Sequence, residues 1–222
     1  MPIPELPSFG DKFSRVGDII RYPKRVLIEA LQSAFAEPYL YTDGPSGERI
    51  ENPFRYVKDE KGETAKDSPL EIADMWSERL NATDPRPIIV VQRDTVSFDK
   101  SAIGLRKNMS MPGNLTTEYA NTSTIPINFL CFSRKDVESE ELALTVALLF
   151  LFFKEYILRK TKLFTISLPS VGTTTPIKQD AEHELFVTPV SLSVMMTLNW
   201  KMTRTDPKKA SDFVIVTTFG EQ

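Results

Sequence analysis

The sequence has 222 residues, a length that suits one large domain or one core domain with extended arms. Its hydrophobic fraction of 41% excludes a disordered chain, because it can bury enough apolar surface to offset the loss of chain entropy. Lys and Arg total 27 against 30 Asp and Glu, and the formal net charge of −3 lacks the basic excess that is typical of proteins that bind duplex DNA.

The N-terminal segment predicts an extended arm over residues 1–17, ahead of a single domain at 18–222. It holds three prolines and two glycines without a sustained period, and it lacks the basic and apolar regions of a secretory signal. Apolar residues then recur at helical spacing, which predicts a helix over 23–36. Pro23 suits its first turn, where the missing N–H has no partner to lose. The apolar face of this helix consists of Leu27, Ala30, Leu31, Ala34 and Phe35.

Residues 41–69 are polar and rich in turn residues, so we expect a protruding loop or hairpin region with a strand at 54–58. At its end, Ser68-Pro69-Leu70-Glu71 matches a capping box with proline at the first helical position. This motif predicts a second helix, and Pro85 bars its continuation. The apolar residues of that helix would be Ile72, Ala73, Trp76 and Leu80.

Beyond Pro87, β-branched and apolar residues predict strands near 88–98 and 125–132. The second strand is apolar on both faces, which is typical of a central strand. The link at 99–122 is too long for an ordinary loop and is expected to protrude as a loop or hairpin. We expect it to contact another chain, and a hairpin folded back on its own sheet is the alternative. The candidate interface residues are Ile103, Leu105, Met109, Met111 and Leu115.

A long helix is predicted from Asp136, as its cap, to about Lys160, with an acidic first turn and a basic last turn that complement the helix dipole. Residues 142–153 are apolar apart from Thr145. That run rises only about 18 Å, against the roughly 30 Å of a membrane hydrocarbon core, and charged residues flank it. We therefore expect a buried helix rather than a membrane span. Its core face would hold Leu144, Leu148 and Leu151.

The last third of the chain predicts strands at 164–168 and 213–218, with a longer strand at 190–203 between them. The longer strand alternates apolar and mostly polar residues and would span about 43 Å, so it either bends across two sheets or projects beyond its domain. Together the elements predict an α+β fold, a two-layer sandwich of a mostly antiparallel sheet covered by helices. The alternating apolar residues are Val190, Leu192, Val194, Met196, Leu198, Trp200 and Met202.

No catalytic constellation is found in the sequence. The single cysteine, Cys131, lies in an apolar strand, which favours a small buried hydrophobe over a reactive thiol. The single histidine, His183, lies in a polar acidic stretch with neither a GxSxG nor an HExxH context, which favours a solvated loop residue over a general base or metal ligand. We therefore expect no enzymatic activity, and no catalytic, cofactor-binding or metal-binding residues.

Several segments occur in a characteristic order. They are the strand segment PIIVVQRDTVSF at 87–98, a strand that ends CFSR at 131–134, an acidic-started helix, and LFVTPV at 185–190, which leads into an amphipathic strand that ends near Trp200. In this order, over about residues 18–204, the chain resembles the tail terminators of tailed bacteriophages, also called tail-completion or neck proteins.

The resemblance implies a sheet covered by helices and a virion structural protein of the tail or neck, assembled in the host cytoplasm without a membrane. Its members form a ring, expected to be a homohexamer, on top of the tail tube, end tube polymerisation and join the tail to the head-completion or connector proteins. The implied partners are further copies of the chain, the tail tube protein and the connector, with the sheath protein as a further candidate. DNA passes through the lumen without sequence readout.

The proline-rich arm and the 41–69 region depart from the shorter members of that family. An adjacent head-completion or baseplate component is therefore an alternative. Two alternatives belong to other classes: an enzyme whose site is completed by a partner chain, and a nonviral adaptor.

Overall fold

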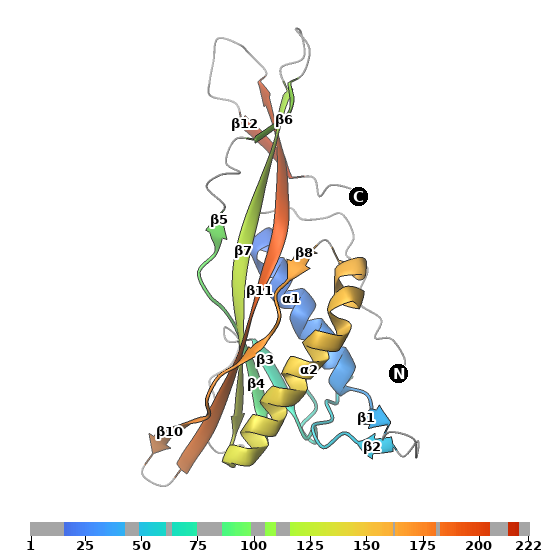
Figure 1. The fold of residues 1–222 in the computed structure, drawn as a ribbon, viewed down its shortest axis with the longest axis vertical. Helices are drawn as coiled ribbons and strands as arrows, with labels where there is room; N and C mark the ends of the chain where they lie inside the picture. Colours follow the sequence, from blue (N-terminus) through green and yellow to red (C-terminus); the bar gives the residue numbers. More distant parts are fainter. Residues whose placement is uncertain are drawn as a thin grey trace.

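The computed structural model describes the secondary structure of residues 16–42, 49–60, 64–74, 86–98, 105–109, 116–161, 163–180, 183–204 and 213–217. Over these residues the chain forms a ten-stranded mixed sheet, a separate two-stranded sheet and two helices (Figure 1). The predicted α+β fold, a mostly antiparallel sheet covered by helices, is confirmed.

Two long strands, β7 (Thr116–Ser133) and β11 (His183–Arg204), form the centre of the large sheet. They pair antiparallel without a register shift from Phe186↔Ser133 to Thr203↔Thr116. At 22 residues, β11 spans roughly 70 Å at the usual strand rise. The predicted central strand near 125–132 and the predicted long strand at 190–203 are therefore confirmed, and both are longer than expected.

Shorter strands pair one after another along the outer edges of these two strands. Along β7 they are β4 (Ile88–Arg93), β5 (Ser97–Phe98) and β6 (Leu105–Met109). Along β11 they are β10 (Thr175–Asp180), β9 (Ser170–Val171), β8 (Leu163–Ile166) and β12 (Phe213–Thr217). The sheet is completed by β3 (Glu71–Asp74), which pairs parallel to β4.

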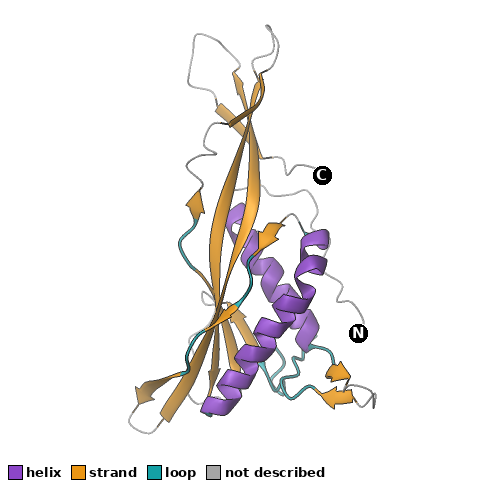
Figure 2. Cartoon of the chain, in the orientation of Figure 1, coloured by secondary structure: helices purple, strands orange, loops and turns teal. Residues whose placement is uncertain are grey.

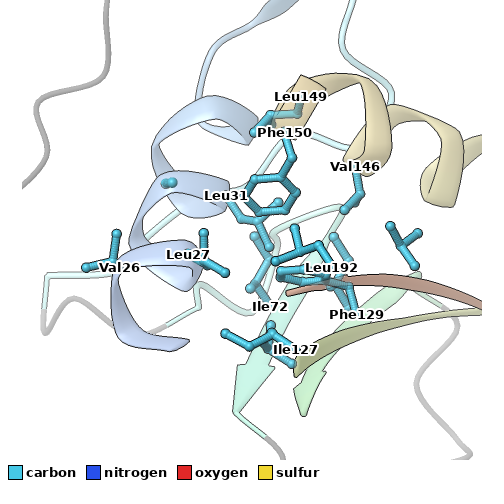
Figure 3. Close-up of a cluster of buried hydrophobic side chains, with 14 of the residues drawn as sticks. Val26, Leu27, Leu31, Ile72, Ile127, Phe129, Val146, Leu149, Phe150 and Leu192 are labelled. Atoms are coloured by element: carbon cyan, nitrogen blue, oxygen red, sulfur yellow. The ribbon is translucent and has the colours of Figure 1, made fainter. Parts of the chain in front are cut away.

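Both helices, α1 (Val16–Phe35) and α2 (Asp136–Lys160), pack against one face of the sheet (Figures 1 and 2). The core between the two layers combines side chains from both helices and from the central strands (Figure 3). The rings of Phe129 and Phe150 lie 4.9 Å apart between centroids and are tilted by 34°, a favourable aromatic arrangement. Further members of this core are Leu27, Leu31, Ile72, Ile127, Val146 and Leu192.

Helix α1 begins at Val16, seven residues before the predicted start, so Val16 and Gly17 belong to the helix and not to an extended arm. The rest of the predicted arm lies outside the described residues. Pro23 lies inside the helix, although it removes one backbone hydrogen bond there. Burial of the neighbouring Tyr22 and Val26 stabilises the helix across this position.

The 41–69 region protrudes only in part. Strands β1 (Tyr39–Thr42) and β2 (Arg49–Glu51) form an antiparallel pair of their own. The following segment packs into the core, because Phe54 and Tyr56 are buried there and the amide of Asn52 donates to the carbonyls of Phe35 and Glu37, at 3.0 Å each. The strand predicted at 54–58 is wrong: only an isolated bridge joins Lys58 to Thr64.

The helix predicted from the capping box is also wrong, because Glu71–Asp74 is strand β3. The hydroxyl of Ser68 accepts from the N–H of Val57 at 3.0 Å and donates to the carbonyl of Leu70 at 2.6 Å, so it caps no helix. Pairing with the buried strand β4 is a non-local interaction that outweighs the local motif. The predicted helical residues Trp76 and Leu80 lie outside the described residues.

Helix α2 has the predicted bounds and the predicted acidic first and basic last turns, but it buries a different face. Leu144, Leu148 and Leu151 are 48%, 38% and 46% exposed, so their prediction as core residues is wrong. The run is apolar all round, and contact with the sheet selects the opposite side: Leu142, Ala143, Val146, Leu149, Phe150 and Ile157.

The predicted cap of α2 needs a correction too. Lys135 is the N-cap residue and makes no side-chain capping bond, while Asp136 is the first helical residue. The carboxylate of Asp136 accepts from the N–H of Val137 at 2.8 Å. The acidic first turn therefore acts through the helix dipole rather than as a cap.

In the 99–122 link, the described part follows the hairpin alternative. Strand β6 pairs antiparallel with β7 from Leu105↔Ala120 to Met109↔Thr117, so it folds back on its own sheet. Of the five candidate interface residues, Leu105 and Met109 belong to β6, and Ile103, Met111 and Leu115 lie outside the described residues.

Candidate interaction surfaces

The chemistry around Cys131 is that of a buried residue. Its side chain in β7 is fully buried, and burial raises the pKa of the thiol far above its ordinary value. A protonated, inaccessible thiol cannot act as a nucleophile at neutral pH. The prediction of a small buried hydrophobe is confirmed.

A chain of hydroxyl groups joins the start of α2 to the sheet. Ser139 donates to the carbonyl of Cys131 at 2.9 Å, and its oxygen lies 2.8 Å from the hydroxyl of Thr188, which in turn lies 2.8 Å from that of Thr174. Because a hydroxyl has a single proton, Thr188 donates to Ser139 and Thr174 donates to Thr188. These groups include no base that could activate a nucleophile, so the chain acts as a buried polar link between the two layers.

Two ion pairs fix strand β3 in place. Lys24 of α1, itself buried, pairs with Asp74, and Arg86 contacts Glu71 at 2.7 Å while donating to the carbonyl of Ala65 at 3.2 Å. These contacts hold the charged groups of Lys24, Glu71 and Arg86 largely inside the fold.

Histidine 183 is placed only by its backbone. His183 is the first residue of β11 and pairs with Asp180 of β10, so it lies in a strand and not in the predicted loop. Among the described residues, no group of three or more His, Cys, Asp or Glu side chains gathers to hold a metal ion. Neither described helix has the length and apolar character that a membrane span requires.

The outward side of α2 carries an unusual concentration of exposed apolar residues. We define the α2 outer face as Val137, Leu144, Leu148, Leu151 and Phe152, whose exposed fractions are 70%, 48%, 38%, 46% and 70%. Positions 144, 148, 151 and 152 follow the i, i+4, i+7, i+8 spacing of one helical stripe. The exposed residues Glu141, Glu155 and Arg159 lie on the same side of the helix. A contiguous exposed apolar stripe of this kind marks an interaction surface.

A second candidate surface is the part of the sheet that extends beyond the helices. We define the ribbon as β6, β12 and the segments of β7 and β11 at 116–122 and 197–204 (Figures 1 and 2). Its register places Trp200 between Tyr119 and Thr217. Neither described helix extends over it in Figure 1, so it reaches away from the core as a narrow four-stranded strip.

The projecting strand of the ribbon is predictable from the sequence, whereas the α2 outer face was not predicted. Alternation from Val190 to Met202 indicated a strand too long for its domain, and the ribbon is the part that projects. The all-round apolar run at 142–153 was the available signal for an exposed stripe, since a helix that is hydrophobic on every side has more apolar surface than one sheet can cover.

A comparison with protein-family models finds no matching family. A comparison with curated protein sequences likewise finds no similar protein.

Proposed function

We propose that this chain is a structural subunit of a bacteriophage neck, which forms a ring at the top of the tail tube, ends tube polymerisation and joins the tail to the head-completion or connector proteins. The proposal begins from the segment order that resembles tail terminators. The single structural observation that supports it is the ribbon, a four-stranded extension of the sheet that neither described helix covers.

A ring subunit needs segments that reach a neighbour. Residues 197–204 of β11 extend over about 26 Å at strand rise, which approaches the diameter of a small domain. The shorter strands β6 and β12 flank the ribbon, so its outer edges carry backbone groups that can pair with another chain. When the ribbon edge of one subunit pairs with a different surface of the next subunit, the contact is head-to-tail. A series of such contacts closes into a ring when the rotation from one subunit to the next permits it.

The charge of the chain fits a lumen through which DNA slides. A formal net charge of −3 gives no strong attraction to the phosphate backbone, so DNA can pass without being held. In this proposal the partners are further copies of the chain in a ring of six, the tail tube protein and the connector, with the sheath protein as a further candidate. Its location is the virion neck, after assembly in the host cytoplasm.

The decisive experiment combines the mass of the assembled protein with its location. Native mass spectrometry of the full chain should show a ring, expected to be a hexamer, and labelled chain should be found at the neck of tailed particles by electron microscopy. Leu105→Asp with Met109→Asp, both in the ribbon, should lower ring formation, and Leu168→Asp outside the ribbon serves as the control. A chain that never exceeds a dimer and is absent from particles contradicts the proposal.

A further inference from the structure

The α2 outer face has the width and spacing of a helix–helix contact. Leu144 and Leu148 stand one turn apart, and Leu151 and Phe152 follow on the next turn, so the four side chains form one stripe along the middle of the helix. Phe152 is 70% exposed, and burying a phenylalanine side chain is favourable because it removes a large apolar area from water. Contact with a second apolar surface would remove this stripe from water and is therefore favourable.

The charged residues on the same side of α2 indicate which surface that is. Glu141 lies at the N-terminal end of the stripe, and Arg159 lies at its C-terminal end, and both are exposed. Two copies of α2 packed antiparallel, with Leu148 of one copy opposite Phe152 of the other, place Glu141 opposite Arg159. Symmetry forms this ion pair twice, and Leu151 of each copy then lies near the twofold axis.

Other arrangements fit the charges less well. A parallel pair of helices places Glu141 against Glu141 and Glu155 against Glu155, and like charges at such close range repel. A bilayer surface binds helices whose polar side is rich in Lys and Arg, whereas two carboxylates border this stripe. Antiparallel packing also opposes the two helix dipoles, which adds a small favourable term.

We propose that α2 is the contact through which two copies of this chain form an isologous dimer, with their α2 helices antiparallel. The contact is self-complementary, because the same stripe is used on both copies. It differs from the head-to-tail contact of a ring, so it does not depend on the proposed function.

The first test measures self-association of the full chain by sedimentation velocity over a concentration series. The unchanged chain should form a dimer. Phe152→Asp should raise the dimer dissociation constant by roughly 100-fold, because a carboxylate would be buried in the apolar contact. Phe164→Asp is the matched control: Phe164 is 60% exposed on β8, outside the stripe, and its replacement should leave the dissociation constant unchanged.

The second test uses charge reversal at the two ends of the stripe, where the exposed positions are tolerant of substitution. Glu141→Arg and Arg159→Glu should each weaken the dimer by roughly tenfold, because two like-charged pairs replace two ion pairs. Combining both substitutions should restore the original dissociation constant. Only an arrangement that brings position 141 of one copy to position 159 of the other gives this rescue.

A covalent cross-link fixes the direction of the helices. A chain with both Glu141→Cys and Arg159→Cys should form a disulfide-linked dimer under mild oxidation, while each single variant should not. In the antiparallel register the two copies of position 141 lie about 27 Å apart along the helix axis, far beyond the reach of a disulfide. The native Cys131 is buried and does not compete.

Three outcomes overturn the proposal: a monomer at every soluble concentration, cross-linking of the single Glu141→Cys variant, or no rescue by the double charge reversal. If Phe152→Asp does not fold, the charge variants decide. Rings without the 141–159 cross-link would overturn the α2 dimer and leave the neck proposal standing. Cross-linked dimers that never enter particles would do the reverse.

Discussion

Cys131 shows how one buried side chain limits the chemistry of this protein. It lies near the C-terminal end of β7, between β4 and β11, and its carbonyl accepts from Ser139 of α2. Its thiol is protonated at neutral pH because burial disfavours the charged thiolate. The residue therefore contributes packing to the two-layer core and no reactivity.

Replacing Cys131 with alanine should change how stability depends on alkaline pH. The folded pKa of the thiol is raised above the ordinary value of 9.0, so its contribution to stability is fully present below pH 9 and is lost as the pH rises. Between pH 9 and pH 10.5 the unchanged chain should lose up to about 1.4 kcal/mol per pH unit more than Cys131→Ala. Urea unfolding at several pH values measures this difference, and identical slopes would contradict it.

At the scale of single elements, α2 separates what local sequence specifies from what packing decides. Its bounds follow from charges that complement the helix dipole, and these are visible in the sequence. Its buried face does not follow from the sequence, because residues 142–153 are apolar on every side and their spacing does not indicate which side packs on the sheet. Packing against the sheet buries Phe150 and leaves Leu148 and Phe152 exposed.

Strand β3 is a case in which non-local pairing overrides a local sequence signal. Ser68-Pro69-Leu70-Glu71 is a good local signal for a helix, yet the parallel partner that makes Glu71–Asp74 a strand lies at Ile88, beyond any local window. The long strands were predictable because alternation is itself a local pattern. The apolar run of α2 indicated that some stripe would stay exposed, but not which one, since that depends on which side of the helix the sheet leaves uncovered.

Alanine substitutions on the two faces of α2 should therefore differ in cost. Phe150 is 1% exposed and packs on Phe129, so Phe150→Ala should lower the free energy of unfolding by about 3 to 5 kcal/mol. Leu148 is 38% exposed, so Leu148→Ala should cost less than about 1 kcal/mol in the monomer. Urea unfolding at a concentration below that of any dimer measures both. Equal costs would show that the outward leucine belongs to the core.

At the scale of the whole molecule, the described residues combine a two-layer core with a ribbon that neither helix covers. In the core, every second residue of β7 from Ile125 to Cys131 belongs to the main apolar cluster, which faces the helices, while Leu130 and Phe132 belong to a smaller cluster with Ile88, Val90 and Val187. The ribbon continues the same two strands beyond α1 and α2, so neither of these helices shields its backbone hydrogen bonds (Figure 1). The β7–β11 pair therefore lies partly beneath the helices and partly beyond them.

This difference should be visible in amide hydrogen exchange of the isolated subunit. Amides of the ribbon at 116–122 and 198–204 should exchange at least roughly tenfold faster than those at 127–132 and 190–194, because local opening of an uncovered sheet exposes little apolar surface and costs less free energy. Exchange followed by mass spectrometry on dilute protein resolves the two ends of each strand. In an assembled neck, the ribbon amides should become as protected as the core if a neighbour covers them. Ribbon amides that are already fully protected in the dilute subunit would show that the ribbon is stable alone, and an unchanged fast exchange after assembly would place the contact between subunits elsewhere on the molecule.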